Sequence, residues 1–116
     1  MRKTWEYEFE TTLSDTAKAI VGYDRDGAKV TDYRIQLVAV VGGTWKQIMR
    51  WDTGHGGPHR DVYRGPDGAE RSRMLVDSTY DPDLGYAEAM TASQNDMRCN
   101  WETYCDSYKQ GEWAYG

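Results

Sequence analysis

A protein of 116 residues is long enough for one domain with its own hydrophobic core, so we expect residues 1–116 to form a single domain. Its net charge is −5, from 19 acidic and 14 basic side chains, which argues against generic binding to nucleic-acid backbones or anionic membranes. The longest apolar run, LVAVV at residues 37–41, is far too short to span a bilayer, and we expect no membrane association.

Alternating polar and apolar residues predict β-strands through the first two thirds of the chain. In residues 4–10, Trp5, Tyr7 and Phe9 alternate with glutamates, and the segment TTLSDT, residues 11–16, is expected to end this strand. In residues 31–41, Tyr33, Ile35, Leu37, Ala39 and Val41 share one face. The other predicted strands are 17–23, 44–52, 59–64 and 69–76, with glycine-containing turns at 24–27, 42–43 and 65–68.

The last third of the chain has a helical pattern. Asp81 followed by Pro82 predicts a helix N-terminus, and Gly111 predicts its end. Between them large apolar residues recur mostly at helical spacing, which favours a core-facing side: Tyr86, Met90, Met97, Trp101, Tyr104 and Tyr108. The predicted class is α+β, an antiparallel sheet of four to six strands with one long C-terminal helix packed across one face.

Two cysteines in this helix indicate a reducing environment. Cys99 and Cys105 are six residues apart, which separates them by about 9 Å of helical rise, too far for a disulfide. No histidine accompanies them, so they do not indicate a zinc site. Free thiols are typical of cytoplasmic proteins, and we expect the protein in the cytoplasm.

The segment RWDTGHGGPHRDVYR, residues 50–64, is the candidate functional site. It contains both histidines of the chain, His55 and His59, together with Asp52 and Asp61. Its three arginines are suited to holding a phosphate: Arg50, Arg60 and Arg64. Metal-free ribonucleases need these residue types, since they use an acid, a base and a cation for the developing charge. On this interpretation the histidines exchange protons and an aspartate orients one of them.

Two other interpretations of the segment stay open. His55 and His59 with one aspartate make a weak metal signal, because HGGPH cannot be helical and loop spacing is permissive; we predict no metal and no cofactor. In the structural interpretation, Asp52 caps a turn and Arg50 pairs with Asp52 or Asp61 across a hairpin. The histidines would then be hydrogen-bonding residues of an ordinary polar turn.

The string RWDTGHGGPHRDVY resembles the signature of a family of small uncharacterised prokaryotic and phage proteins, R-W/Y-D-T/N-x-H-G-x-x-H-R-D. The helical segment EAMTASQNDMRCNWETYCDSY is similar to that family's A-x-x-D-I-x-x-N-W-x-x-Y helix, which adds Asn100 and Trp101. More distantly, the string resembles TumE-like toxins of toxin–antitoxin pairs, which implies a toxin acting on RNA. Asp61 stands where the TumE-like string tends to have a second histidine.

Two functional hypotheses follow. The first is a toxin-related, nuclease-like protein with its site in residues 50–61. The second is a non-catalytic protein-binding module, an inhibitor or accessory factor encoded by a phage or mobile element. Compactness, negative charge and exposed tyrosines suit the second. The expected partner is accordingly RNA or a protein, and the sequence is also compatible with a homodimer.

Overall fold

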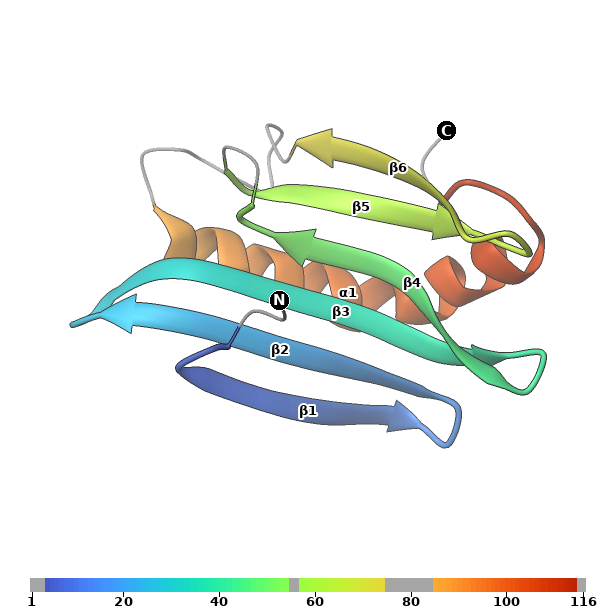
Figure 1. Cartoon of the computed structure of the whole chain (residues 1–116), viewed down its shortest axis with the longest axis horizontal. Coiled ribbons are helices and arrows are strands. Elements are labelled where there is room, and N and C mark those ends of the chain that lie inside the picture. Colours follow the sequence, from blue (N-terminus) through green and yellow to red (C-terminus); the bar gives the residue numbers. More distant parts are fainter. Residues whose placement is uncertain (1–3, 55–56, 75–84, 115–116) are drawn as a thin grey trace.

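The computed structural model describes residues 4–54, 57–74 and 85–114. Six strands form one antiparallel sheet in chain order, as Figure 1 shows. They are β1 (Tyr7–Ser14), β2 (Ala17–Asp26), β3 (Lys29–Val41), β4 (Thr44–Asp52), β5 (His59–Arg64) and β6 (Ala69–Met74), and helix α1 (Tyr86–Lys109) follows. The predicted α+β class, with a sheet and one C-terminal helix, is confirmed.

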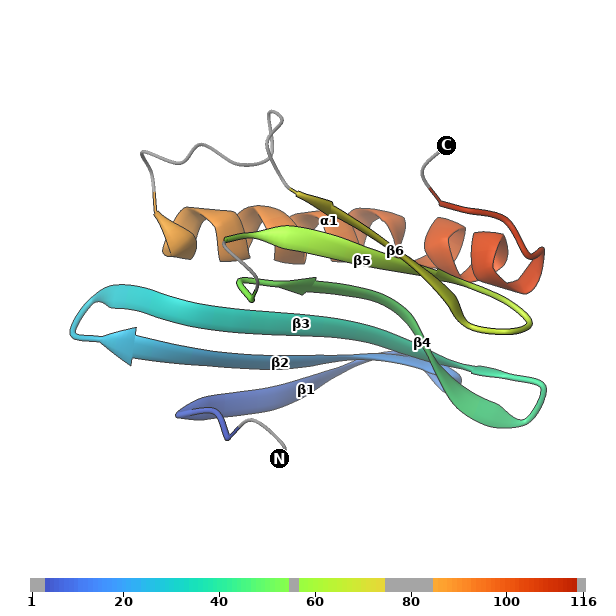
Figure 2. The same ribbon diagram turned by 45° about the horizontal axis from the view of Figure 1, so that its top comes forward.

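Helix α1 lies across one face of the sheet and leaves the other face without a helix (Figure 2). It packs on β3, β4 and β5. Four of the five inward-facing residues predicted for β3 are buried, with Tyr33, Ile35 and Leu37 at 0% exposure, and the fifth, Val41, is partly buried. Met97, Tyr104 and Tyr108 supply the buried side of the helix, so the apolar stripe of α1 serves the core. We call the two faces of the sheet the helix side and the open side.

The first strand differs from its prediction. Residues 11–14 continue β1 instead of ending it, and only Asp15 and Thr16 separate β1 from β2. Trp5 precedes the strand and lies against Gly22, where an added Cβ would come within 2.5 Å of the indole. Gly22 belongs to the open side, since its neighbour Val21 is buried on the helix side. Trp5 therefore does not share a face with Phe9, as the alternation predicted.

The helix also begins later than predicted. Asp81 and Pro82, the predicted start, lie outside the described residues, and α1 begins at Tyr86 after Gly85, whose φ is 85°. It ends at Lys109, and Gly111 has a φ of 71°, so the predicted stop is confirmed. In the part of the chain that the structure describes, no helix is long and apolar enough to cross a membrane. Both cysteines are free, Cys99 exposed and Cys105 buried.

Strand β4 contains a bulge that changes which way its side chains point. Met49 pairs with Leu37 and Gln47 pairs with Val38, so Ile48 is one residue extra. Before the bulge, Trp45 faces the open side and is 47% exposed. After it, Met49 and Trp51 face the helix side and are fully buried. The bulge thus sets the orientation of the residues that follow, which include the candidate site.

Candidate functional site

The candidate segment occupies the adjacent strands β4 and β5, whose residues pair directly. Arg50 lies opposite Asp61, and Asp52 lies opposite His59. Between these pairs Trp51 lies opposite Arg60. Because side chains alternate along a strand, Trp51 and Arg60 point to the helix side and the other four to the open side. The segment is therefore divided between two faces of the sheet.

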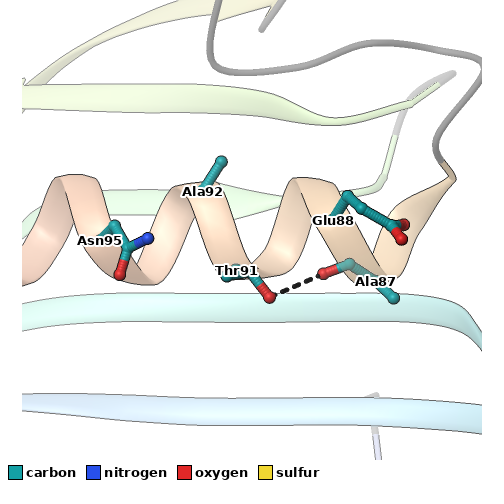
Figure 3. Close-up of a pocket in the computed structure, with 5 residues that line it drawn as sticks. All are labelled: Ala87, Glu88, Thr91, Ala92 and Asn95. Carbon is teal, nitrogen blue, oxygen red and sulfur yellow. Dashed lines mark hydrogen bonds between the residues drawn. The ribbon is translucent and has the colours of Figure 1, made fainter.

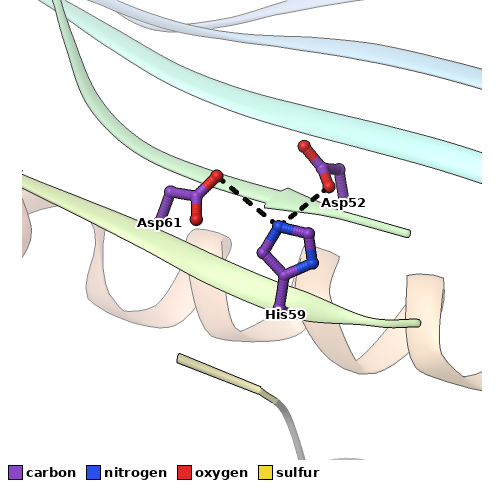
Figure 4. A group of neighbouring side chains, drawn as sticks. All are labelled: Asp52, His59 and Asp61. Carbon is purple, nitrogen blue, oxygen red and sulfur yellow. Dashed lines mark ion pairs between the residues drawn. The ribbon is translucent and has the colours of Figure 1, made fainter. Parts of the chain in front are cut away.

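On the open side, His59 lies between two carboxylates, as Figure 4 shows. Its Nε2 is 3.1 Å from Asp52 Oδ1 and 3.6 Å from Asp61 Oδ2. Arg50 contacts the same carboxylates, with Nε 3.0 Å from Asp52 Oδ2 and Nη2 2.5 Å from Asp61 Oδ2. We call Arg50, Asp52, His59 and Asp61 the open-side cluster. The side chains of its two aspartates and His59 are only 3–7% exposed.

Both ring nitrogens of His59 contact a potential hydrogen-bond partner. Nδ1 lies 3.0 Å from the carbonyl oxygen of Gly57, and Nε2 faces Asp52. These two contacts fix the orientation of the ring between β4 and the backbone at Gly57.

Two arginines form the solvent-facing margin of the cluster. Arg50 and Arg34 have side chains that are 23% and 34% exposed. Arg34 Nε is 3.6 Å from Asp52 Oδ2, and its guanidinium lies over the Trp5 ring, 5.7 Å from the centroid. Burial acts to lower the pKa of Arg50, but its hydrogen bond to Asp61 and the nearby negative groups raise it above the ordinary value. Arg50 is therefore always charged.

Beside this margin, Tyr63 is kept neutral. Burial is the largest cause of its shift and raises its pKa to about 12, against the opposing effect of the Arg50 charge. Glu70 lies 4.0 Å from Arg50 and also hydrogen-bonds to Tyr63. Tyr63 thus serves as a hydrogen-bonding hydroxyl near neutral pH.

Among the residues that the structure describes, Asp52, His59 and Asp61 form a group that could hold a metal ion. Their ligand atoms lie within 4.8 Å of one another. Carboxylate oxygens and an imidazole suit several divalent metals. Arg50, however, already contacts both carboxylates, so a cation would compete with a fixed positive charge. The sequence-based expectation of no metal stays a prediction, and the contacts of Arg50 give it a physical basis.

On the helix side, a second polar network centres on Asp96 of α1. Its carboxylate accepts hydrogen bonds from Trp51 Nε1 at 3.1 Å and from Arg60 Nη1 at 3.0 Å. Asn100 Nδ2 donates to it at 3.0 Å, and the Tyr104 hydroxyl also donates to it. We call these five residues the helix-side network. It joins the two segments that carried the sequence resemblance, residues 50–61 and the helix.

The structure separates the three arginines predicted to bind phosphate. Only Arg50 lies beside His59. Arg60 faces the helix side, and so does Arg64, whose guanidinium lies 4.6 Å from the centre of the Trp113 ring. His55 lies outside the described residues. Trp101 is half-buried and packs against the hydrophobic core.

Sequence reasoning did not single out Asp96 or Arg34. For Asp96 a signal existed, since Asp96, Asn100 and Tyr104 recur every four residues and so share one side of a helix. Arg34 gave no comparable signal. It contacts Asp52 because those residues pair across β3 and β4, and that register is visible only in the folded chain.

A separate hollow lies along the first turns of α1, shown in Figure 3. It has a volume of about 320 Å³ and is lined by Ala87, Glu88, Thr91, Ala92 and Asn95. The Thr91 hydroxyl donates a hydrogen bond to the Ala87 carbonyl at 3.1 Å. Glu88 is the one charged side chain among these five lining residues. Without a partner for acid–base chemistry, this hollow is a weaker candidate than the open-side cluster.

The chain was compared with models of protein families. The model of DUF7718, a domain of unknown function, matches residues 2–113. The chain belongs to the DUF7718 family. This confirms the predicted membership of an uncharacterised family, and the open-side cluster and the helix-side network both lie within the DUF7718 domain. No curated protein and no solved structure matches the chain.

Proposed function

We propose that this DUF7718 protein is a nuclease-like enzyme that cleaves RNA at the open-side cluster. The observation that carries the proposal is the contact of His59 with two buried carboxylates, beside an arginine that shares them. This set supplies a proton donor, groups that orient it and a cation. The resemblance of residues 50–61 to TumE-like toxins supports a toxin-related role, and two free thiols support a cytoplasmic location.

In this mechanism His59 acts as the general acid. The 2′-oxygen of the RNA attacks phosphorus, the 5′-oxygen leaves, and His59 gives its proton to that leaving oxygen. Asp52 and Asp61 hold the ring in position. His55 is the proposed base that accepts the 2′-hydroxyl proton.

The geometry changes which arginines are proposed to bind phosphate. Arg60 and Arg64 face the helix side, so Arg50 and Arg34 take this role. Both retain exposed surface at the margin of the cluster, whereas His59 is almost fully buried. The phosphate is therefore proposed to approach over the two guanidinium groups.

The test is RNA cleavage by purified protein. With a labelled single-stranded RNA, we expect His59→Gln to lower the cleavage rate about 100-fold, the usual contribution of a general acid. Arg34→Gln should lower it about tenfold through the loss of one phosphate contact. Arg64→Gln is the matched control, because this arginine lies on the helix side, and it should leave the rate within about twofold.

Because His59 is buried, its variant must first be shown to fold by circular dichroism. Arg34→Gln changes a partly exposed side chain and tests the same site with less risk to the fold. Absence of cleavage by the folded wild-type protein on structured and unstructured RNAs would contradict the proposal. So would a folded His59→Gln variant that cleaves at the wild-type rate.

The second candidate function is a non-catalytic protein-binding module. The observation that favours it lies far from the open-side cluster, on edge strand β1. Tyr7 and Phe9 there are two of the three large hydrophobic residues that are exposed in the described part of the chain. Exposed apolar residues that gather on one element are typical of interaction surfaces.

A further inference from the structure

Strand β1 presents an edge that could accept another strand. It is eight residues long and is the first strand of the sheet, and no described strand pairs with its outer side. Every second residue of such a strand directs its N–H and C=O groups away from the sheet. These groups are a template for an added strand, which would obtain its main-chain hydrogen bonds from β1.

The helix side of β1 is largely aromatic and is not covered by the helix, and at its start the Arg25 guanidinium lies over the Tyr7 ring, 4.7 Å from the centroid. Tyr7 and Phe9 are 38% and 45% exposed, because α1 packs on β3, β4 and β5 and does not reach β1. Between β1 and the helix runs a groove of about 300 Å³, lined by Phe9, Thr11, Val21, Gln94, Met97 and Arg98. Apolar side chains of an added strand would lie beside Tyr7, Phe9 and this groove.

The open side of β1 is acidic. Glu8 and Glu10 alternate with the aromatic residues, and both are exposed. Lys18 Nζ lies 3.6 Å from Glu10 Oε1. The Lys18 side chain is 31% exposed, whereas that of Glu10 is 57% exposed. An added strand would therefore meet apolar groups on one side and carboxylates on the other.

A second copy of this chain is disfavoured in the two registers that are centred on Phe9 or on Glu8. When two identical strands pair antiparallel about a twofold axis, residues opposite each other lie on the same side of the sheet. An axis through Phe9 places Glu8 opposite Glu10, and an axis through Glu8 places Glu8 opposite itself. Like charges directly opposite each other destabilise strand pairing. The acidic row thus favours a basic partner.

We propose that β1 binds an extended segment of a partner protein as a seventh strand. In this segment lysine or arginine alternates with apolar residues, so that the basic side chains meet Glu8 and Glu10 and the apolar ones meet Tyr7 and Phe9. Main-chain hydrogen bonds supply affinity, and the two rows of side chains set specificity. This proposal is independent of the nuclease proposal, since β1 contributes nothing to the open-side cluster.

The probe is a fluorescent nine-residue peptide in which lysine and valine alternate. We expect saturable binding to the intact protein by fluorescence anisotropy, with amide shift changes in nuclear magnetic resonance spectra confined to β1 and β2. A peptide with glutamate in place of lysine should not bind. Glu8→Gln and Glu10→Gln should each weaken binding about threefold, as expected for exposed charge pairs.

Glu102→Gln is the matched control, because Glu102 is an exposed glutamate on α1. It should leave the affinity unchanged if the β1 glutamates recognise the peptide. Equal weakening by Glu102→Gln would show nonspecific attraction to an acidic protein and would overturn the proposal. Absence of binding, or shift changes away from β1, would overturn it as well.

Discussion

Strands β4 and β5 carry two polar networks back to back. On the helix side, Asp96 accepts hydrogen bonds from three elements: from Trp51 of β4, from Arg60 of β5, and from Asn100 and Tyr104 of its own helix. On the open side, Asp52 and Asp61 contact Arg50 and His59, and all four residues belong to the same two strands. Both networks contain buried charged side chains and both join aromatic or basic groups to carboxylates, yet only one of them connects the helix to the sheet.

This difference distinguishes a structural role from the functional role that we propose for the open-side cluster. The helix-side network fixes α1 on the sheet, which is sufficient reason for its burial. The open-side cluster joins strands that are already hydrogen-bonded to each other, and a buried ion pair contributes little net stability. Buried charges that do not help to assemble the fold mark a site suited to chemistry. Three changes test this distinction.

The largest effect on stability is expected from Asp96→Ala. It removes the acceptor of the helix-side network and leaves the buried Arg60 guanidinium without that carboxylate. We expect the free energy of unfolding in urea to fall by about 3 kcal/mol, the scale for removing one partner of a buried ion pair. Asp106→Ala, at an exposed position of the same helix, should cost less than about 0.5 kcal/mol. Similar losses for the two variants would remove the structural role assigned to Asp96.

A smaller and reversible effect is expected from Arg50→Gln. Without this guanidinium the carboxylates of Asp52 and Asp61 repel each other, which should cost about 2 kcal/mol. Mn²⁺ should then restore much of the stability by binding Asp52, His59 and Asp61 in place of the lost charge. The measurement is the thermal midpoint with and without Mn²⁺. An equal rise in the wild-type protein would show that Arg50 does not exclude a cation.

The smallest effect on stability is expected from the titration of two groups, Tyr63 on the open side of the sheet and Cys105 on the helix side. Burial raises the pKa of Tyr63 to about 12 on the open side and that of Cys105 to about 11 in the core beneath the helix. In both cases folding disfavours the ionised form of the side chain. The contribution of the group to the free energy of unfolding is therefore fully present below its pKa in the unfolded chain, and it is lost as the pH rises toward its pKa in the folded protein. We expect stability to decline above about pH 9 for Cys105 and above about pH 10 for Tyr63.

Because Tyr63 is only partly buried, its contribution is on the order of 1 kcal/mol after solvent screening, and we expect a contribution of similar size from Cys105. Urea titrations from pH 8 to pH 11 provide the measurement. Cys105→Ala should flatten the first part of the decline and Tyr63→Phe the second. If neither variant changes the slope, the decline arises from other groups.

Local pattern was sufficient to predict much of the fold. Alternation in residues 31–41 identified β3 and its buried side, and glycines marked the turns after β3 and β5. The helical spacing of Met97, Trp101 and Tyr104 identified the core-facing side of α1. These signals are local, because each depends on residues within one element and on the periods of 2 and 3.6 residues.

The arrangement of the site could be predicted only in part. The sequence grouped Arg50, Asp52, His59 and Asp61 correctly in one segment, but their convergence depends on the register between β4 and β5. Local sequence does not determine that register. It also could not separate Arg60 from the cluster, since its opposite orientation follows from strand pairing and from Asp96, 36 residues farther along the chain.

The extra residue Ile48 in β4 has a consequence for comparing DUF7718 sequences. It divides β4 into two halves, and the side on which each residue points is determined separately in each half. The hairpin at Gly42–Gly43 determines it in the first half, and pairing with β5 determines it in the second. Counting in steps of two from Trp45 assigns Arg50 and Asp52 to the wrong side of the sheet. Alignments should therefore be anchored on the Arg50-Trp51-Asp52 triplet, and a change of length in the hairpin need not turn the cluster toward the helix.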